Sequence, residues 1–108
     1  MWRKNRSKSK NSRCAGVDLN RNFGHKFGGS GTSNNPCSEI YRGPRAFSEP
    51  ESRAIRDFIL KNNKDNRFKA YLTIHSYSQV WLYPWGYTAD LPADWKELVR
   101  YYILNLKS

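Results

Sequence analysis

The sequence predicts an α/β fold in which helices pack against part of a mixed central β-sheet. Three observations predict it: a helix with a start signal at Ser48, alternating apolar residues at 68–74, and a second amphipathic helix from about Pro92. Elements in the order helix, strand, strand, helix are expected when helices cover a sheet.

The first helix is predicted from its cap and its periodicity. Ser48 and Glu51 have the spacing of a capping box, and Pro50 suits the first helical turn. Asn62 and Asn63 end the segment. The apolar residues between these ends recur at helical spacing and are expected to form one face: Ala54, Ile55, Phe58 and Ile59.

Two strands and a second helix are predicted after it. Apolar and polar residues alternate over 68–74, and a shorter apolar stretch at 80–83 precedes the turn signal Pro84-Trp85-Gly86. From about Pro92 to the end of the chain, apolar residues return to helical spacing. The predicted apolar face of this helix consists of Trp95, Leu98, Val99, Tyr102, Ile103 and Leu106.

The first 47 residues have mainly loop composition. Residues 1–13 are polar and basic, residues 14–19 are compatible with a short extended segment, and residues 22–47 are rich in Gly, Ser, Asn and Pro. A loop as long as 22–47 usually carries function or needs a covalent link to hold it. We expect a long irregular connection, pinned by the cysteines.

The chain contains two cysteines, Cys14 and Cys37, and no C-x-x-C pair, which argues against a structural zinc site. One disulfide in an oxidising compartment is the simplest use of two cysteines. Two separate thiols in a reducing compartment are the alternative, and the spacing alone fits both.

Composition indicates a folded chain with little apolar material for a core of its own. The 108 residues suffice for one small domain, and 15% are aromatic, unlike a disordered tail, but only 38% are hydrophobic. This mismatch suggests a piece of something larger.

The net charge is +10, and residues 1–26 hold eight Lys and Arg against one Asp. Such a basic segment attracts nucleic acid, anionic membranes or substrates that end in carboxylates, or it is a solvated loop. Met1-Trp2-Arg3-Lys4 is not followed by an apolar run, and no stretch has the length of a membrane span. No membrane partner is therefore expected.

His75 directly follows the predicted strand at 68–74, where binding sites of open α/β sheets gather. A histidine there can bind a metal or transfer protons, although on position alone a hydrogen-bonded structural role is more frequent. His25 lies in a Gly-rich loop and is expected to be exposed. Asn20 and Arg21 could grip a carboxylate, or could simply belong to a turn in which Asp and Asn bond their own backbone.

Six segments resemble, in order and spacing, the A/B family of zinc metallocarboxypeptidases (peptidase M14). The resemblance runs from residue 1 to about residue 88, and beyond Ala89 only a helix of the right kind matches. The six segments are Met1-Trp2-Arg3-Lys4-Asn5-Arg6, Gly16-Val17-Asp18-Leu19-Asn20-Arg21-Asn22-Phe23, Asn35-Pro36-Cys37-Ser38-Glu39, Ser48-Glu49-Pro50-Glu51, Ala70-Tyr71-Leu72-Thr73-Ile74-His75-Ser76-Tyr77-Ser78-Gln79 and Leu82-Tyr83-Pro84-Trp85-Gly86-Tyr87.

The resemblance implies a role for each of several residues. His75 is expected to be the third ligand of a catalytic Zn²⁺. Arg3 is expected to polarise the scissile carbonyl and stabilise the oxyanion, and Asn20 and Arg21 to clamp the terminal carboxylate of the substrate. An Arg fork with a neighbouring amide suits that task by charge and geometry together.

The same resemblance places Ser76 and Tyr77 in neighbouring substrate subsites, with Ser76 acting mainly through its backbone, and pairs Cys14 with Cys37. It also implies an extracellular protein, monomeric in its full-length form, whose targeting signal lies outside this segment. Its expected partners are the C-termini of peptides and proteins. No specific nucleic-acid partner is expected.

The rest of the family's active site does not occur in the 108 residues. A catalytic zinc usually takes three protein ligands, and the family supplies two from a His-x-x-Glu motif that is not present here. The family's general-base glutamate and its specificity-pocket residue lie beyond residue 108. We therefore expect residues 1–108 to be one partial catalytic domain, truncated at both ends, that neither retains zinc nor cleaves peptides alone.

Two other classes of function remain open at this stage. A noncatalytic module could keep the carboxylate clamp without the metal. A basic nucleic-acid-binding protein would explain the charge and the interleaved aromatic residues, and it predicts steeply salt-dependent binding. The family resemblance explains the same residues more specifically.

Overall fold

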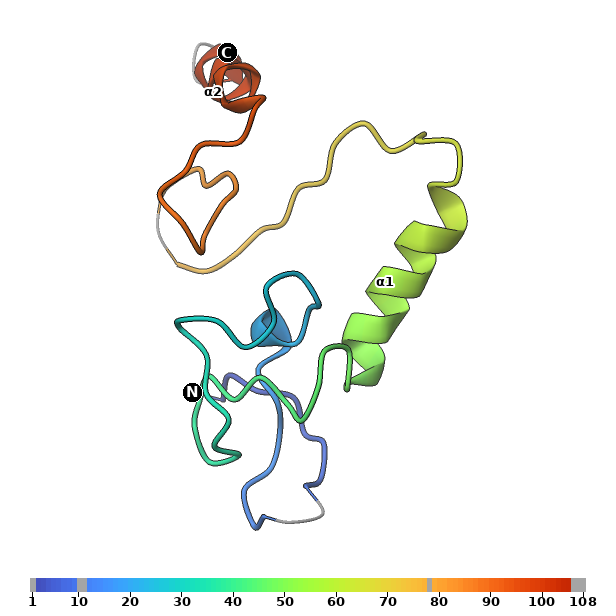
Figure 1. The fold of residues 1–108 in the computed structure, drawn as a ribbon, viewed down its shortest axis with the longest axis vertical. Coiled ribbons are helices and arrows are strands. Elements are labelled where there is room, and N and C mark those ends of the chain that lie inside the picture. Colours follow the sequence, from blue (N-terminus) through green and yellow to red (C-terminus); the bar gives the residue numbers. More distant parts are fainter. Residues whose placement is uncertain (1, 10–11, 78, 106–108) are drawn as a thin grey trace. The chain divides into compact units, whose positions relative to one another are not determined.

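The computed structural model describes residues 2–9, 12–77 and 79–105, which form two compact units, residues 1–71 and residues 72–108. The first unit holds a short 3-10 helix, η1 (Leu19–Arg21), and helix α1 (Pro50–Asn62). The second unit holds helix α2 (Trp95–Asn105). Figure 1 shows these elements joined by long irregular segments.

Both predicted helices are confirmed, with shifted boundaries. Helix α2 starts at Trp95, three residues after the predicted start at Pro92. The last predicted member of its apolar face, Leu106, lies outside the described residues.

The two predicted strands, 68–74 and 80–83, are not strands in the described part of the chain. In the described residues, the β-type pairing is an isolated parallel bridge elsewhere in the chain, between Ser33 and Tyr41. A strand requires a hydrogen-bonded neighbour. Residues 68–77 instead run as an exposed, extended segment (Figure 1).

The interior of the first unit is mainly polar. Among the described residues, the buried hydrophobic side chain is Val17, at 3% exposure. The buried polar and charged residues are more numerous: Lys4, Asp18, Asn22, Glu49 and Ser52. Buried polar groups must be hydrogen-bonded, and no buried side-chain nitrogen or oxygen described here lacks a partner. A hydrogen-bonded network therefore occupies the place of an apolar core.

Backbone contacts and a disulfide hold the loops of this unit together. The Asn5 N–H donates to the Val17 carbonyl (2.9 Å), and the Asp18 N–H donates to the Tyr41 carbonyl (2.8 Å). Cys14 and Cys37 form the disulfide. The expectation of an irregular connection over 22–47, pinned by the cysteines, is confirmed.

Helix α1 starts differently from the predicted capping box. Its N-cap is Glu49 rather than Ser48, and no side chain caps it, although Pro50 does occupy the first turn. The Ser48 hydroxyl is already engaged, because it accepts from Asn22 Nδ2 (2.8 Å) and donates to Glu49 Oε1 (2.7 Å). The hydroxyl thus serves the polar network instead of the helix end.

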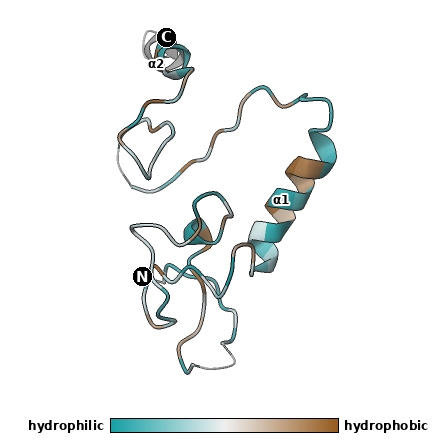
Figure 2. Ribbon diagram, in the orientation of Figure 1, coloured by the Kyte–Doolittle hydropathy of each residue, from teal (hydrophilic) through white to brown (hydrophobic). Residues whose placement is uncertain are grey.

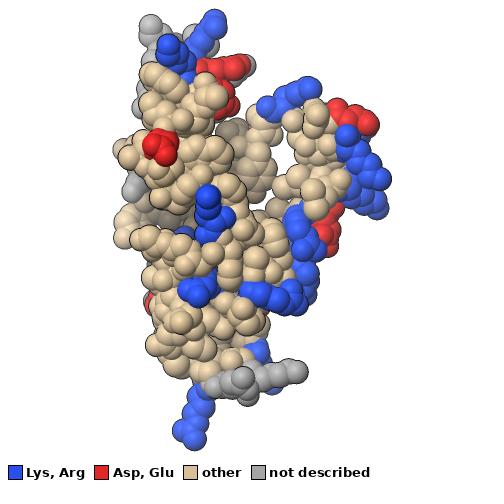
Figure 3. Space-filling model, in the orientation of Figure 1, with Lys and Arg blue, Asp and Glu red and all other residues tan. Residues whose placement is uncertain are grey.

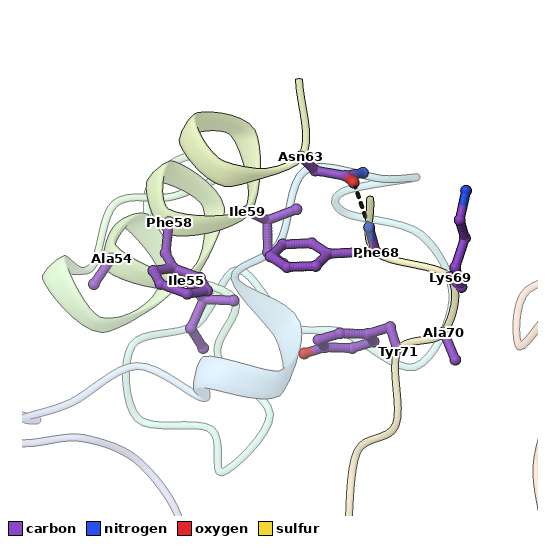
Figure 4. A pocket seen from close by; sticks show the side chains of 9 residues that line it. All are labelled: Ala54, Ile55, Phe58, Ile59, Asn63, Phe68, Lys69, Ala70 and Tyr71. Atoms are coloured by element: carbon purple, nitrogen blue, oxygen red, sulfur yellow. Dashed lines mark hydrogen bonds between the residues drawn. The ribbon is translucent and has the colours of Figure 1, made fainter. Parts of the chain in front are cut away.

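The predicted apolar face of α1 lines an open groove of about 870 Å³ (Figure 4). Phe58 stacks on Phe68 with ring centroids 6.2 Å apart, and the Phe68 N–H donates to Asn63 Oδ1 (2.9 Å). Apolar residues gather in the second half of this helix (Figure 2). On the face drawn in Figure 3, Lys and Arg side chains cover more area than Asp and Glu, and uncharged residues cover most of it.

The second unit exposes much of its apolar surface. Leu72, Ile74 and Leu82 are 76%, 101% and 89% exposed. Its Ser76–Tyr77 and Pro84–Trp85 peptide bonds are cis. In the described residues, neither α1 nor α2 has the length and hydrophobicity needed to cross a membrane.

Candidate functional site

The turn around η1 forms because Asp18 caps it. Asp18 has extended backbone angles, and its Oδ1 accepts a hydrogen bond from the Asn20 N–H (3.1 Å). The Asp18 carbonyl accepts from the Arg21 N–H (2.9 Å). This is the self-bonded turn that the sequence offered as the plainer interpretation. It fixes the backbone that carries Asn20 and Arg21.

The same Asp18 carboxylate also holds Arg3. The Arg3 Nε donates to Asp18 Oδ2 at 2.8 Å. The Asp18 side chain is 4% exposed, whereas that of Arg3 is 46% exposed. A charge-assisted bond to a buried carboxylate orients the guanidinium while leaving it accessible. Asp18 therefore brings together three of the residues predicted from the sequence: its carboxylate bonds to Arg3 and Asn20, and its backbone carbonyl bonds to Arg21.

Arg21 is anchored by backbone carbonyls. Its Nε donates to the Gly31 carbonyl (2.9 Å), and its Nη1 donates to the Asn20 carbonyl (3.3 Å). The guanidinium of Arg21 is half-buried, and the neighbouring Asn20 is exposed. A cationic fork held beside an exposed amide can bind a carboxylate.

Glu49 lies in the network behind the turn. Burial raises the pKa of its carboxyl, but hydrogen bonds from Asn5, Ser48 and Ser7 and the charge of Arg53 outweigh burial. The pKa of Glu49 consequently lies below its ordinary value. The carboxylate stays ionised and keeps these donors in place.

Sequence reasoning treated Asp18 as a turn residue and assigned no role to Asn22. Both lie in the Asp-x-Asn-Arg-Asn segment, and both are almost fully buried. Their burial depends on how distant loops pack, so the sequence itself carries no signal that marks them.

His75, Ser76 and Tyr77 belong to the second unit. All three are exposed, Tyr77 to 93%. They follow one another on the extended segment after the predicted strand, so His75 is open to a ligand from outside the unit. His25, in the first unit, is exposed as expected.

A catalytic zinc ion takes three protein ligands. Within residues 2–9, 12–77 and 79–105, no three His, Cys, Asp or Glu side chains gather as a metal site. The two cysteines are consumed by the disulfide. His75 offers one imidazole, so the described residues do not make up a zinc site by themselves.

The family pattern of the zinc carboxypeptidases matches residues 1–105 of the chain. The chain belongs to the zinc carboxypeptidase family. Zn²⁺ is the metal that the description of this family names. The sequence-based assignment to A/B metallocarboxypeptidases is confirmed.

Relatives of both the A and B types are similar to this chain. Carboxypeptidase B of Astacus astacus is 50% identical over 99 residues, which cover 91% of this chain and 32% of the relative. Carboxypeptidase A1 of Sus scrofa is 52% identical over 98 residues, covering 91% of this chain and 23% of the relative. The chain therefore spans a quarter to a third of the length of such relatives.

Solved structures agree on the fold. Bovine thrombin-activatable fibrinolysis inhibitor, solved with a tick carboxypeptidase inhibitor, aligns with a TM-score of 0.84 and 46% identity, covering 91% of this chain and 33% of that one. Carboxypeptidase A from Helicoverpa armigera aligns with a TM-score of 0.81 and 44% identity, covering 90% and 23%. The α/β class is supported by these solved relatives, whereas the described residues do not form the predicted part of a mixed sheet.

Proposed function

We propose that this chain is the substrate-recognition segment of a zinc-dependent metallocarboxypeptidase, which hydrolyses the C-terminal peptide bond of proteins and peptides. The observation that carries the proposal is the shared Asp18 carboxylate. It holds Arg3 at 2.8 Å and the Asn20 N–H at 3.1 Å. A group for the scissile carbonyl and a clamp for the terminal carboxylate are thereby tied to one buried anchor.

Asn20 and Arg21 clamp the free carboxylate of the substrate. An exopeptidase must recognise that carboxylate and hold it at a fixed distance from the reacting bond. The amide of Asn20 and the guanidinium of Arg21 supply neighbouring donors, and the guanidinium adds opposite charge. A peptide with an amidated C-terminus offers no charge to this clamp.

Arg3 stabilises the oxyanion of the tetrahedral intermediate. In the described residues only its Nε bonds to Asp18, which leaves the two Nη nitrogens as donors. A fixed cation aimed at developing negative charge stabilises the transition state more than the ground state. The bond to Asp18 orients the Arg3 guanidinium before the substrate binds.

His75 contributes one imidazole to the metal site, and Ser76 and Tyr77 line the adjacent substrate subsites. Zinc, when bound, lowers the pKa of its water and polarises the carbonyl. The other two metal ligands and the general base come from outside these 108 residues, so the chain alone is inactive.

The segment belongs to a larger catalytic domain in a secreted protein. Residues 1–108 are part of one catalytic domain, and 68–74 and 80–83 become strands of its mixed sheet once neighbouring strands are present. The full-length protein is an extracellular monomer. The Cys14–Cys37 disulfide supports an oxidising compartment.

Titration with N-acetyl-phenylalanine and with its C-terminal amide, followed by NMR, tests the clamp. The chain is expected to bind the carboxylate in preference to the amide. Arg21→Met should weaken binding of the carboxylate about tenfold or more, because a charged hydrogen bond is lost. Arg13→Met is the matched control, since it removes an equal charge from an exposed residue of the same unit. Equal binding of both probes by the unsubstituted chain would refute the proposal.

A further inference from the structure

We propose that Asn22 is the positioning residue of the carboxylate clamp: its buried amide fixes the η1 turn against residues 42–48 and the start of α1. The inference rests on the function proposed for Asn20 and Arg21. Asn22 follows Arg21 directly and ends the turn as its C-cap.

The Asn22 side chain is fully buried, at 0% exposure, and both ends of its amide are bonded. Its Nδ2 donates to the carbonyls of Arg42 (2.8 Å) and Arg45 (3.2 Å) and to the Ser48 hydroxyl (2.8 Å). Its Oδ1 accepts from the Glu49 N–H (3.1 Å) and the Ser52 hydroxyl (2.6 Å). An asparagine offers two donor hydrogens and an acceptor oxygen, and all are used here.

The backbone of Asn22 is bonded as well. Its N–H donates to the Leu19 carbonyl (3.2 Å), which closes the turn, and its carbonyl accepts from the Phe47 N–H (2.7 Å). The position of the turn relative to residues 42–48 is therefore set from the main chain and the side chain of one residue.

The network continues from Asn22 to the segment that carries Arg3. The Ser48 hydroxyl donates to Glu49 Oε1 (2.7 Å), and Asn5 Nδ2 donates to Glu49 Oε2 (2.8 Å). The Val17 N–H in turn donates to Asn5 Oδ1 (2.8 Å). The same chain of hydrogen bonds thus holds both backbone segments that carry the proposed substrate contacts.

The backbone at Gly43 packs closely on the Asn22 amide. Gly43 has φ +85°, and a Cβ built on it would lie 2.8 Å from Asn22 Nδ2. The backbone of 42–48 therefore packs directly on the Asn22 amide. A tightly packed, fully hydrogen-bonded amide one residue from Arg21 restricts the motion of the turn that carries the clamp.

Asn22→Asp tests the inference, because it keeps the shape and an acceptor oxygen but replaces the Nδ2 donor with an ionisable oxygen. Amide hydrogen exchange is measured at Asn20, Arg21 and Asn22 and, as an internal reference, at Asn63 at the end of α1, whose N–H donates to Ile59. Exchange at the turn should rise at least tenfold relative to Asn63. Preference for N-acetyl-phenylalanine over its amide should fall at least tenfold.

Phe68→Ala is the control for general destabilisation, because it removes the ring stacked on Phe58, and the recorded partners of Phe68, Phe58 and Asn63, lie outside the Asn22 network. It should leave the probe preference within about twofold of the unsubstituted chain. An unchanged turn exchange rate in Asn22→Asp would overturn the inference. So would a rate that rises equally at Asn63, because Asn22 would then support the whole unit.

Failure of the proposed function gives a different result. If the unsubstituted chain binds the carboxylate and the amide probes equally, the carboxylate clamp is refuted. The exchange measurement needs no probe, so it still decides whether Asn22 fixes the turn.

Discussion

At the scale of single residues, the Asp18 carboxylate joins two functions, because it caps the η1 turn and holds the Arg3 guanidinium. Asp18→Ala removes both contacts. The loss of an N-cap and of a charged hydrogen bond should lower the free energy of unfolding by about 2 kcal/mol, and it should weaken carboxylate binding.

Urea unfolding and probe titration measure these effects. Asp57→Ala is the matched control, since its carboxylate pairs with the adjacent Arg56 on the exposed side of α1. That exposed pair contributes little. If the two alanine variants were equally stable and bound the probe equally, Asp18 would not be the anchor.

Glu49 makes the stability of the first unit depend on pH. Its folded pKa lies below the ordinary value of 4.5, because its hydrogen bonds and Arg53 outweigh the effect of burial. The stabilisation is therefore present above pH 4.5 and is lost as pH falls from 4.5 through the folded pKa.

Unfolding measured from pH 7 down to pH 3 should show this loss in the unsubstituted chain. Glu49→Gln, which does not titrate, should show a shallower dependence over the acidic part of that range. Parallel pH profiles for the two proteins would contradict the assigned role of Glu49.

Residue roles could be proposed from the sequence mainly through the family resemblance. Arg3 and Asn20 were predicted through the family resemblance, whereas the partner that unites them was not. The Arg3–Asp18 contact spans 15 residues, and the Asn22–Ser52 contact spans 30. No local spacing rule reports such pairs, since they depend on how distant loops pack.

At the scale of elements, helix α1 was predictable because its apolar residues repeat at helical spacing and Asn62 and Asn63 end it. Its cap was predicted wrongly, because the Ser48 hydroxyl bonds to Asn22 and Glu49. Periodicity identifies the helix, but tertiary contacts decide which residue begins it.

The strands predicted at 68–74 and 80–83, in contrast to α1, do not form in the described residues. Their alternation was real, but a strand also needs a paired neighbour, and the described residues of this chain form one isolated bridge elsewhere. Alternation predicts the side-chain faces of a strand and cannot supply its partner.

The disulfide encloses the η1 turn, because Cys14 precedes it and Cys37 follows it. Replacing both cysteines by serine should lower the free energy of unfolding by about 3 kcal/mol in the chain-entropy model. Thermal unfolding with and without a thiol reductant measures this.

The reductant should lower the unfolding midpoint of the unsubstituted chain and leave that of the double variant unchanged. A midpoint that did not respond to reduction in the unsubstituted chain would show that the cross-link contributes nothing. The double variant controls for effects of the reductant itself.

At the scale of the whole molecule, the chain has the fold of a zinc carboxypeptidase over about 90% of its length but spans about a third or less of its relatives. The residues proposed to recognise the substrate, Arg3, Asn20 and Arg21, are held by hydrogen bonds within the first unit. The apolar residues Leu72, Ile74 and Leu82 remain exposed. Under the proposed function, the 108 residues therefore hold the groups that bind the substrate carboxylate but only one of the metal ligands.

The zinc content of the purified 108-residue chain tests this division most directly. After equilibration with zinc and dialysis, the account predicts far less than one bound zinc per chain, because His75 supplies one imidazole and three protein ligands are needed. His75→Ala should retain no less zinc than the unsubstituted chain. Retention of about one zinc per chain that is lost in His75→Ala would contradict the account.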